Sequence, residues 1–145
     1  MQGVIFKKVF NLKPVCFLIF LLGLSEQLSA QMKDINNLQL ISLMEKKVPI
    51  IDIRKESEWK ETGIIEGSHL LTFFNSDGKY DLPAWMESLQ QIVGSDRPVI
   101  ILCRSGRRSA IVGNFLVNKE NYQEVYNVKY GIKGWMEARL KIDKY

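Results

Sequence analysis

Short apolar runs recur along the chain, each bounded by charged residues or turn-forming residues. Residues 48–53 (VPIIDI) and 98–102 (PVIIL) are rich in β-branched side chains, which is typical of strands buried on both faces of a parallel sheet. Residues 124–128 form a further strand candidate, and residues 64–74 have room for a short strand before the Asn-Ser-Asp-Gly turn at 75–78. The pattern therefore predicts a small sheet of short strands.

Helical periodicity fills most of the space between these strands. Apolar residues recur about every three positions between 34 and 47, with Asp34 as the candidate cap. Residues 82–93 carry Pro83 in the first predicted turn and Gly94 just beyond the end, as helices commonly do. Further helical segments are predicted at residues 56–61, 109–119 and 132–140. Strands that alternate with helices indicate an α/β domain with a mostly parallel sheet and helices on both faces.

Composition agrees with one ordinary globular domain. The chain has 145 residues, of which 46% are hydrophobic and 25% are charged, and this excludes two full-sized domains as well as a wholly disordered chain. The net charge is +4, but residues 31–145 carry only +2 of it. Such a small excess argues against nucleic acid as a partner.

The basic excess lies at the amino terminus and changes the picture of residues 1–30. Three lysines precede an apolar run at 15–24 (VCFLIFLLGL), and a more polar stretch ends at Leu28-Ser29-Ala30. This is the order of a secretory signal peptide. Ten residues of helix span about 15 Å, half of a bilayer core, so a retained shallow anchor is the weaker alternative. We therefore expect cleavage after Ala30, a periplasmic or secreted domain at 31–145, and membrane contact only through an uncleaved signal segment.

Removal of the signal peptide would leave Cys103 as the single remaining cysteine, and one cysteine cannot form an intramolecular disulfide. It follows the predicted strand 98–102 and opens the segment Cys103-Arg104-Ser105-Gly106-Arg107-Arg108-Ser109 before the next predicted helix. Open α/β sheets bind ligands at such strand ends, and the backbone N–H groups of a glycine turn and a helix start favour an anion. The same groups, with three nearby arginines, favour a nucleophilic thiolate over an inert buried thiol.

At this point the chain resembles the single-domain rhodanese-like family. The segment CRSGRRS is similar to the family's active-site loop, C-R-[ST]-G-x-R-[ST]. Residues 51–54 (IDIR) with 58–59 (EW) resemble its D-x-R followed by an acidic-aromatic pair. Residues 63–68 (GIIEGS) resemble G-H-I-x-G-A, and residues 130–135 (YGIKGW) resemble G-G-x-x-x-W, with Ile64, Ser68 and Tyr130 as departures. The matches follow the family's order across roughly residues 48–140.

The resemblance implies a rhodanese-type sulfurtransferase. Cys103 would take sulfur from a small anionic donor such as thiosulfate, hold it as a persulfide, and pass it to a cyanide-like or thiol acceptor, including a protein thiol. Loop N–H groups would stabilise the persulfide without a metal or another cofactor. Arg108 would organise the loop, whereas Arg104 and Arg107 would face the donor. Asp52 and Arg54 would give structural support, and Arg54 is spaced for an ion pair with Glu58.

Other functions remain as alternatives. The same loop would serve a non-enzymatic persulfide carrier that delivers sulfur to a partner protein. Cysteine phosphatases and arsenate reductases place arginine after five intervening residues, where this chain has Ser109, and a C-x-x-C oxidoreductase would need cysteine in place of Gly106. His69 is the chain's one histidine, which argues against a His-rich metal site, and Trp59, Trp85 and Trp135 are expected to pack in the core.

Overall fold

The computed structural model describes residues 30–145, and its centre is a five-stranded sheet in the order β1-β5-β4-β2-β3. Every neighbouring pair of strands is parallel. The strands are β1 (Gln31–Ile35), β2 (Ile50–Asp52), β3 (His69–Leu70), β4 (Val99–Leu102) and β5 (Glu124–Val128). The predicted signal peptide lies outside the described residues, apart from Ala30.

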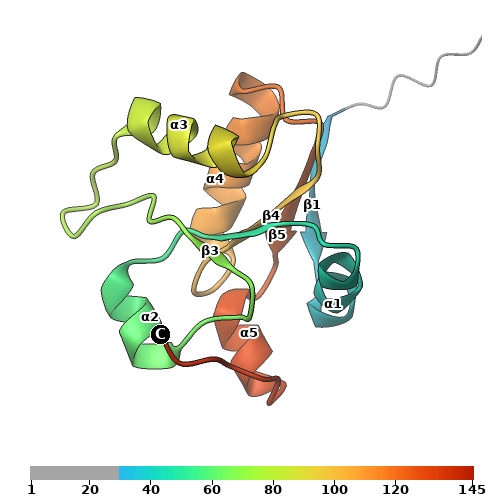
Figure 1. The fold of residues 1–145 in the computed structure, drawn as a ribbon, viewed down its shortest axis with the longest axis vertical. Helices are drawn as coiled ribbons and strands as arrows, with labels where there is room; N and C mark the ends of the chain where they lie inside the picture. The colour runs from blue at the N-terminus through green and yellow to red at the C-terminus, as the bar shows by residue number, and fades with distance from the viewer. Residues whose placement is uncertain (1–29) are drawn as a thin grey trace, which may run out of the picture.

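Five helices surround this sheet (Figure 1). They are α1 (Asn37–Glu45), α2 (Glu56–Thr62), α3 (Leu82–Ile92), α4 (Arg107–Lys119) and α5 (Gly131–Glu137). Helices α3 and α4 contribute buried side chains to one apolar cluster, and α1 and α5 contribute to a second cluster. Successive residues of β4 alternate between the two clusters, which places one cluster on each face of the sheet. The predicted α/β class, with a parallel sheet and helices on both faces, is confirmed.

The first strand was not predicted and corrects the amino-terminal helix. Residues 34–35 belong to β1, because Asn36 caps α1 through a capping box with Gln39 and starts the helix at Asn37. Only Ile35 of β1 is buried, so the strand carries almost no hydrophobic pattern of its own. The strand is instead stabilised by parallel pairing with β5 along its whole length.

The remaining predicted elements are confirmed with small shifts of their ends. Helix α3 begins behind Asp81, whose side chain accepts a hydrogen bond from the Ala84 N–H at 3.2 Å. Helix α4 begins two residues earlier than expected because Gly106 adopts the left-handed conformation at its N-cap. Helix α5 ends at Glu137 rather than at residue 140, because Arg139 has a positive φ that does not continue a helix.

The three tryptophans pack in the interior, as expected. Trp59, Trp85 and Trp135 are each 5–6% exposed, and the latter two join the clusters on opposite faces of the sheet. Across residues 30–145, no helix is both long and apolar enough to span a bilayer.

Candidate functional site

The structure places Cys103 directly after the carboxyl end of β4, at the start of the loop that leads into α4. The side chain is completely buried. Its Sγ accepts a hydrogen bond from the Gly106 backbone N–H at 3.2 Å and lies 3.2 Å from the Ser109 hydroxyl oxygen. The sulfur therefore faces an N–H group from the turn of the loop and a hydroxyl group from the first turn of α4. This is the strand-end position where parallel sheets hold their ligands.

The turn of the loop depends on glycine at position 106. Gly106 has a φ of +86°, and a Cβ at this position would overlap the backbone carbonyl of Lys129. Any other residue would meet both the left-handed backbone strain and a fixed neighbour on the β5–α5 connection. Glycine thus lets the loop pack against this connection while its N–H reaches the sulfur.

Helix α5 supports the loop from the same side. The N–H groups of Ile132 and Lys133 donate to the carbonyl oxygens of Cys103 and Arg104, at 2.9 and 3.1 Å. Gly131, with a φ of +59°, provides the space, since a Cβ there would overlap these same carbonyl groups. The close approach falls on Gly131 rather than on the residue before it. Tyr130, which departs from the family pattern, is mostly exposed and leaves this contact intact.

Arg108 anchors the loop to α2. Its two terminal nitrogens bind the two carboxylate oxygens of Glu58, at 2.8 and 2.6 Å. Burial raises the pKa of Glu58, but the hydrogen bonds from Arg108 and the Lys55 N–H, with the Arg108 charge, outweigh it and leave this pKa below its usual value. The same carboxylate raises the pKa of Arg108. The pair is therefore ionised at neutral pH and joins two elements that are 50 residues apart.

Arg54 makes a different ion pair from the one expected. Both Arg54 and Asp52 are completely buried, and the Arg54 Nη2 atom lies 2.7 Å from the Asp52 carboxylate. Arg54 meets Glu58 only at its backbone carbonyl, at 3.3 Å, so the predicted Arg54–Glu58 ion pair is wrong. The spacing rule for helical pairs fails because Arg54 precedes α2. Its guanidinium instead ties the end of β2 to Thr62 and Gly63 at the end of α2.

The remaining loop side chains, Arg104, Ser105 and Arg107, are exposed. Arg104 lies 3.8 Å from the Glu61 carboxylate, and more than half of each of the two side chains is exposed. Within the described residues, no carboxylate pairs with Arg107. The loop thus combines one buried thiol with two exposed guanidinium groups on its solvent side. Such an arrangement can attract a small anion toward a nucleophilic sulfur.

The sequence analysis did not identify two further residues, Asn127 and Asp34, as part of this site. The Ser109 hydroxyl lies 2.6 Å from the Asn127 side-chain oxygen, and the Asn127 amide nitrogen donates to Asp34 at 2.8 Å. Asn127 is 3% exposed and is the polar member of the three buried residues of β5, beside Val125 and Val128. An amide beside apolar residues of a predicted strand is a usable sequence signal, because such a group needs a partner once it is buried.

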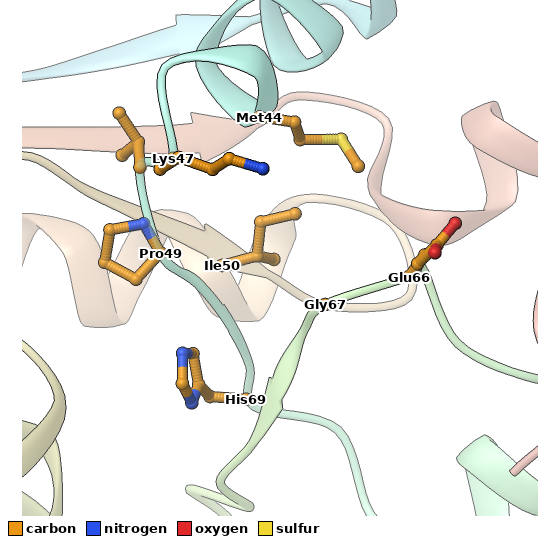
Figure 2. Close-up of a pocket in the computed structure, with 8 residues that line it drawn as sticks. Met44, Lys47, Pro49, Ile50, Glu66, Gly67 and His69 are labelled. Carbon is orange, nitrogen blue, oxygen red and sulfur yellow. The ribbon is translucent and has the colours of Figure 1, made fainter.

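A cavity of about 450 Å³ lies elsewhere on the molecule. Figure 2 shows Met44 and Lys47 on one side of it and His69 on the other. Its walls include the first residues of β2 and β3, whereas Cys103 follows the carboxyl end of β4 in the same parallel sheet. The cavity is therefore not part of the Cys103 site. In the described part of the chain, no group of three or more His, Cys, Asp and Glu side chains could hold a metal ion.

Known proteins resemble this chain in sequence and in fold. The thiosulfate sulfurtransferase GlpE of Vibrio cholerae is 26% identical over 110 residues, which cover 76% of this chain and 92% of that protein. The crystal structure of Rv0390 from M. tuberculosis matches with a TM-score of 0.65 at 24% identity, over 81% of this chain and all of that one. The homodimeric polysulfide-sulfur transferase of Wolinella succinogenes matches with a TM-score of 0.61 at 18% identity, over 83% and 84% of the two chains.

The family model called Rhodanese-like domain matches residues 36–138, which extend from the cap of α1 to the end of α5 and include the whole Cys103 loop. The match covers well over half of the chain and contains each of the segments that carry the sequence resemblance. This chain therefore belongs to the rhodanese-like domain family.

Proposed function

We propose that this protein is a sulfurtransferase that works through a persulfide on Cys103. The Cys103 thiolate attacks the outer sulfur of thiosulfate, the sulfur–sulfur bond of the donor breaks, and sulfite leaves with the bonding electrons. An acceptor thiolate or a cyanide-like nucleophile then attacks the outer sulfur of the persulfide and releases Cys103 as a thiolate. Both steps are nucleophilic displacements on sulfur, so no metal or redox cofactor takes part.

The position of Cys103 is the observation that carries this proposal. The sulfur lies between the end of a buried strand and the first turn of α4, where the Gly106 N–H already points at it. Arg104 and Arg107 are exposed on the same loop and supply positive charge for an anionic donor. The likeness to a thiosulfate sulfurtransferase over most of the chain supports the same chemistry.

Mass spectrometry of the purified protein before and after incubation with thiosulfate tests the proposal. We expect Cys103 to gain the mass of one sulfur atom and one sulfite to appear in solution for each sulfur loaded. The Cys103→Ser variant should show neither change. A wild-type protein whose Cys103 reacts with iodoacetamide but never gains sulfur would contradict the assignment, because the thiol would then be accessible and yet unable to accept sulfur.

A persulfide carrier is the second candidate, and an apolar surface near the loop favours it. Ile111 lies one helical turn after Arg107 on α4 and is 64% exposed. It lines a small apolar pocket with Phe74, Tyr80 and Phe115. A carrier must dock its partner protein near the sulfur, and exposed apolar patches commonly mark such contacts.

Turnover separates the enzyme from the carrier. With excess thiosulfate and a small thiol acceptor, the enzyme releases many sulfite molecules for each protein molecule. A carrier releases one sulfite and then stops until its partner protein is added. Ile111→Ser should leave turnover with small acceptors unchanged, and it should slow delivery only if a protein acceptor uses this surface.

We also propose that the mature protein is exported and begins near Gln31. The first strand starts at Gln31, so cleavage after Ala30 would leave every described strand and helix in place. N-terminal sequencing of protein from the native cell envelope tests this proposal, and an intact Met1 in the membrane fraction would contradict it.

A further inference from the structure

Three side chains behind Cys103 form a hydrogen-bonded chain that runs from the loop to the first strand. It begins at Ser109 on α4, which is completely buried and lies 3.2 Å from the Cys103 sulfur. It continues through Asn127 on β5, at 2.6 Å, and ends at Asp34 on β1, at 2.8 Å from the Asn127 amide nitrogen. The two displacement steps proposed above assign no role to these residues.

The direction of this chain follows from the number of protons each group carries. A carboxylate can only accept hydrogen bonds, so Asp34 requires the NH₂ group of Asn127 to face it. The Asn127 oxygen must then face Ser109, and an amide oxygen also only accepts. The single hydroxyl proton of Ser109 is therefore committed to Asn127 and cannot also be donated to the sulfur.

We propose that Asn127 and Asp34 are positioning residues that keep resting Cys103 as a thiol. With its proton committed to Asn127, Ser109 presents only lone pairs to the sulfur and accepts the S–H of Cys103. All hydrogen bonds of the chain then run in one direction, from Cys103 through Ser109 and Asn127 to Asp34. A Cys103 thiolate would have no S–H to donate to Ser109, and its negative charge would face an oxygen lone pair. The hydrogen-bonded chain therefore opposes ionisation of Cys103.

Other groups around Cys103 act in the opposite direction. The Gly106 N–H donates to the sulfur, and Arg108 of α4 interacts electrostatically with it. The other charged groups on the surrounding elements include Arg104 and Arg107 of the loop, the Asp52–Arg54 pair at the end of β2, Glu58 and Glu61 of α2, Lys129 on the β5–α5 connection, Lys133 of α5, and Lys33 beside Asp34. Ionisation of Cys103 thus depends on a balance between the groups that favour the thiolate and the opposing hydrogen bond to Ser109. The proposal concerns only the contribution of Ser109.

This balance has a chemical benefit for a domain whose described residues contain one cysteine. The thiolate is the form that oxidants attack, so a resting thiol is better protected. When Cys103 reacts, its proton passes to water. Rotation of the Asn127 amide by half a turn, with loss of its bond to Asp34, would let Ser109 donate to the sulfur.

Asp34→Asn tests the proposal, because asparagine has the size of aspartate but can donate as well as accept. The Asn127 amide is then free to turn, and Ser109 is free to donate to a thiolate. We expect iodoacetamide to alkylate Cys103 at least about tenfold faster at pH 6, and the rise of the rate with pH to move to lower pH, as for one added hydrogen bond to a charged group. Asp34→Glu keeps a group that only accepts, and it should react at nearly the wild-type rate.

The Ser109→Ala background shows whether the effect passes through the hydroxyl. There, the change from Asp34 to Asn should no longer accelerate alkylation. Equal acceleration in both backgrounds would overturn the proposal, since it would show that the Asp34 charge acts through space. The absence of any acceleration in the Asp34→Asn single variant would also overturn it. The inference rests on Cys103 as the reacting group of the proposed function. Iodoacetamide needs no sulfur donor, so normal alkylation without sulfur loading would contradict the function alone.

Discussion

The two sides of the Cys103 loop are built very differently. The floor, formed by Cys103, Gly106, Arg108 and Ser109, is buried or half-buried and contacts α2, β5 and α5. The rim, formed by Arg104, Ser105 and Arg107, is exposed, and its one ion pair is long and open to solvent. Three arginines within five positions therefore do separate work. Arg108 holds the scaffold, while the two rim arginines keep their charge available for an anion.

The buried pair behind the floor should give the largest effect on stability. Arg54→Met leaves the buried Asp52 carboxylate without its guanidinium partner, which costs about 3–5 kcal/mol in the free energy of unfolding. Urea denaturation measures this loss. The same substitution on the rim, Arg104→Met, is the matched control and should change stability by less than about 0.5 kcal/mol. Equal losses in the two variants would remove the distinction between a supported floor and a free rim.

The glycine turn of the floor should give the second-largest effect on stability. Gly106→Ala adds a strained left-handed residue and a steric overlap with Lys129, and we expect a loss of about 3 kcal/mol together with loss of sulfur loading. Gly78 provides a control, because its φ of +74° is similar and a Cβ there would meet nothing within 4 Å. Gly78→Ala should therefore cost only the strain, about 1 kcal/mol. Similar losses in the two variants would show that backbone strain alone decides.

The Glu58–Arg108 pair predicts a smaller effect that depends on pH. Because folding lowers the pKa of Glu58, the stabilisation is present above the usual glutamate pKa and is lost as the pH falls through the folded value. Glu58→Gln should cost about 1–2 kcal/mol at pH 7, and its difference from wild type should shrink as the pH falls below about 4. Denaturation at a series of pH values measures this difference. A constant difference would mean that the charge of Glu58 contributes nothing.

The rim should give the smallest effect on stability and a clear effect on kinetics. Arg104→Gln and Arg107→Gln should leave the unfolding free energy within about 0.5 kcal/mol of wild type. Each should raise the KM for thiosulfate roughly fivefold, as expected for one lost charge interaction near the surface, and more so at low salt. Lys119→Gln, at the far end of α4, serves as the control and should change neither quantity. A fall in kcat alone would place these arginines in the chemical step instead.

Local patterns account for most of what could be predicted from the sequence. The β-branched runs at β2 and β4 identify buried strands, and the Cys103 loop is one contiguous segment whose chemistry can be read directly. Contacts between distant segments could not be found in this way. Glu58 meets Arg108 across 50 residues, Asn127 meets Ser109 across 18, and Asp34 meets Asn127 across 93. The strand β1 was missed for the same reason, since its stability comes from β5.

The pairing of β1 with β5 also bears on how the domain folds. The first strand completes the sheet only after the last strand has formed, because Gln31 pairs with Glu124 and Ile35 with Val128. Contacts between such distant segments require closure of most of the chain and are therefore slow to form. Asp34 joins Asn127 only at that step. A folding intermediate without β1 would thus already hold the Cys103 loop but lack the end of its hydrogen-bonded chain, so its cysteine would react before the domain was complete.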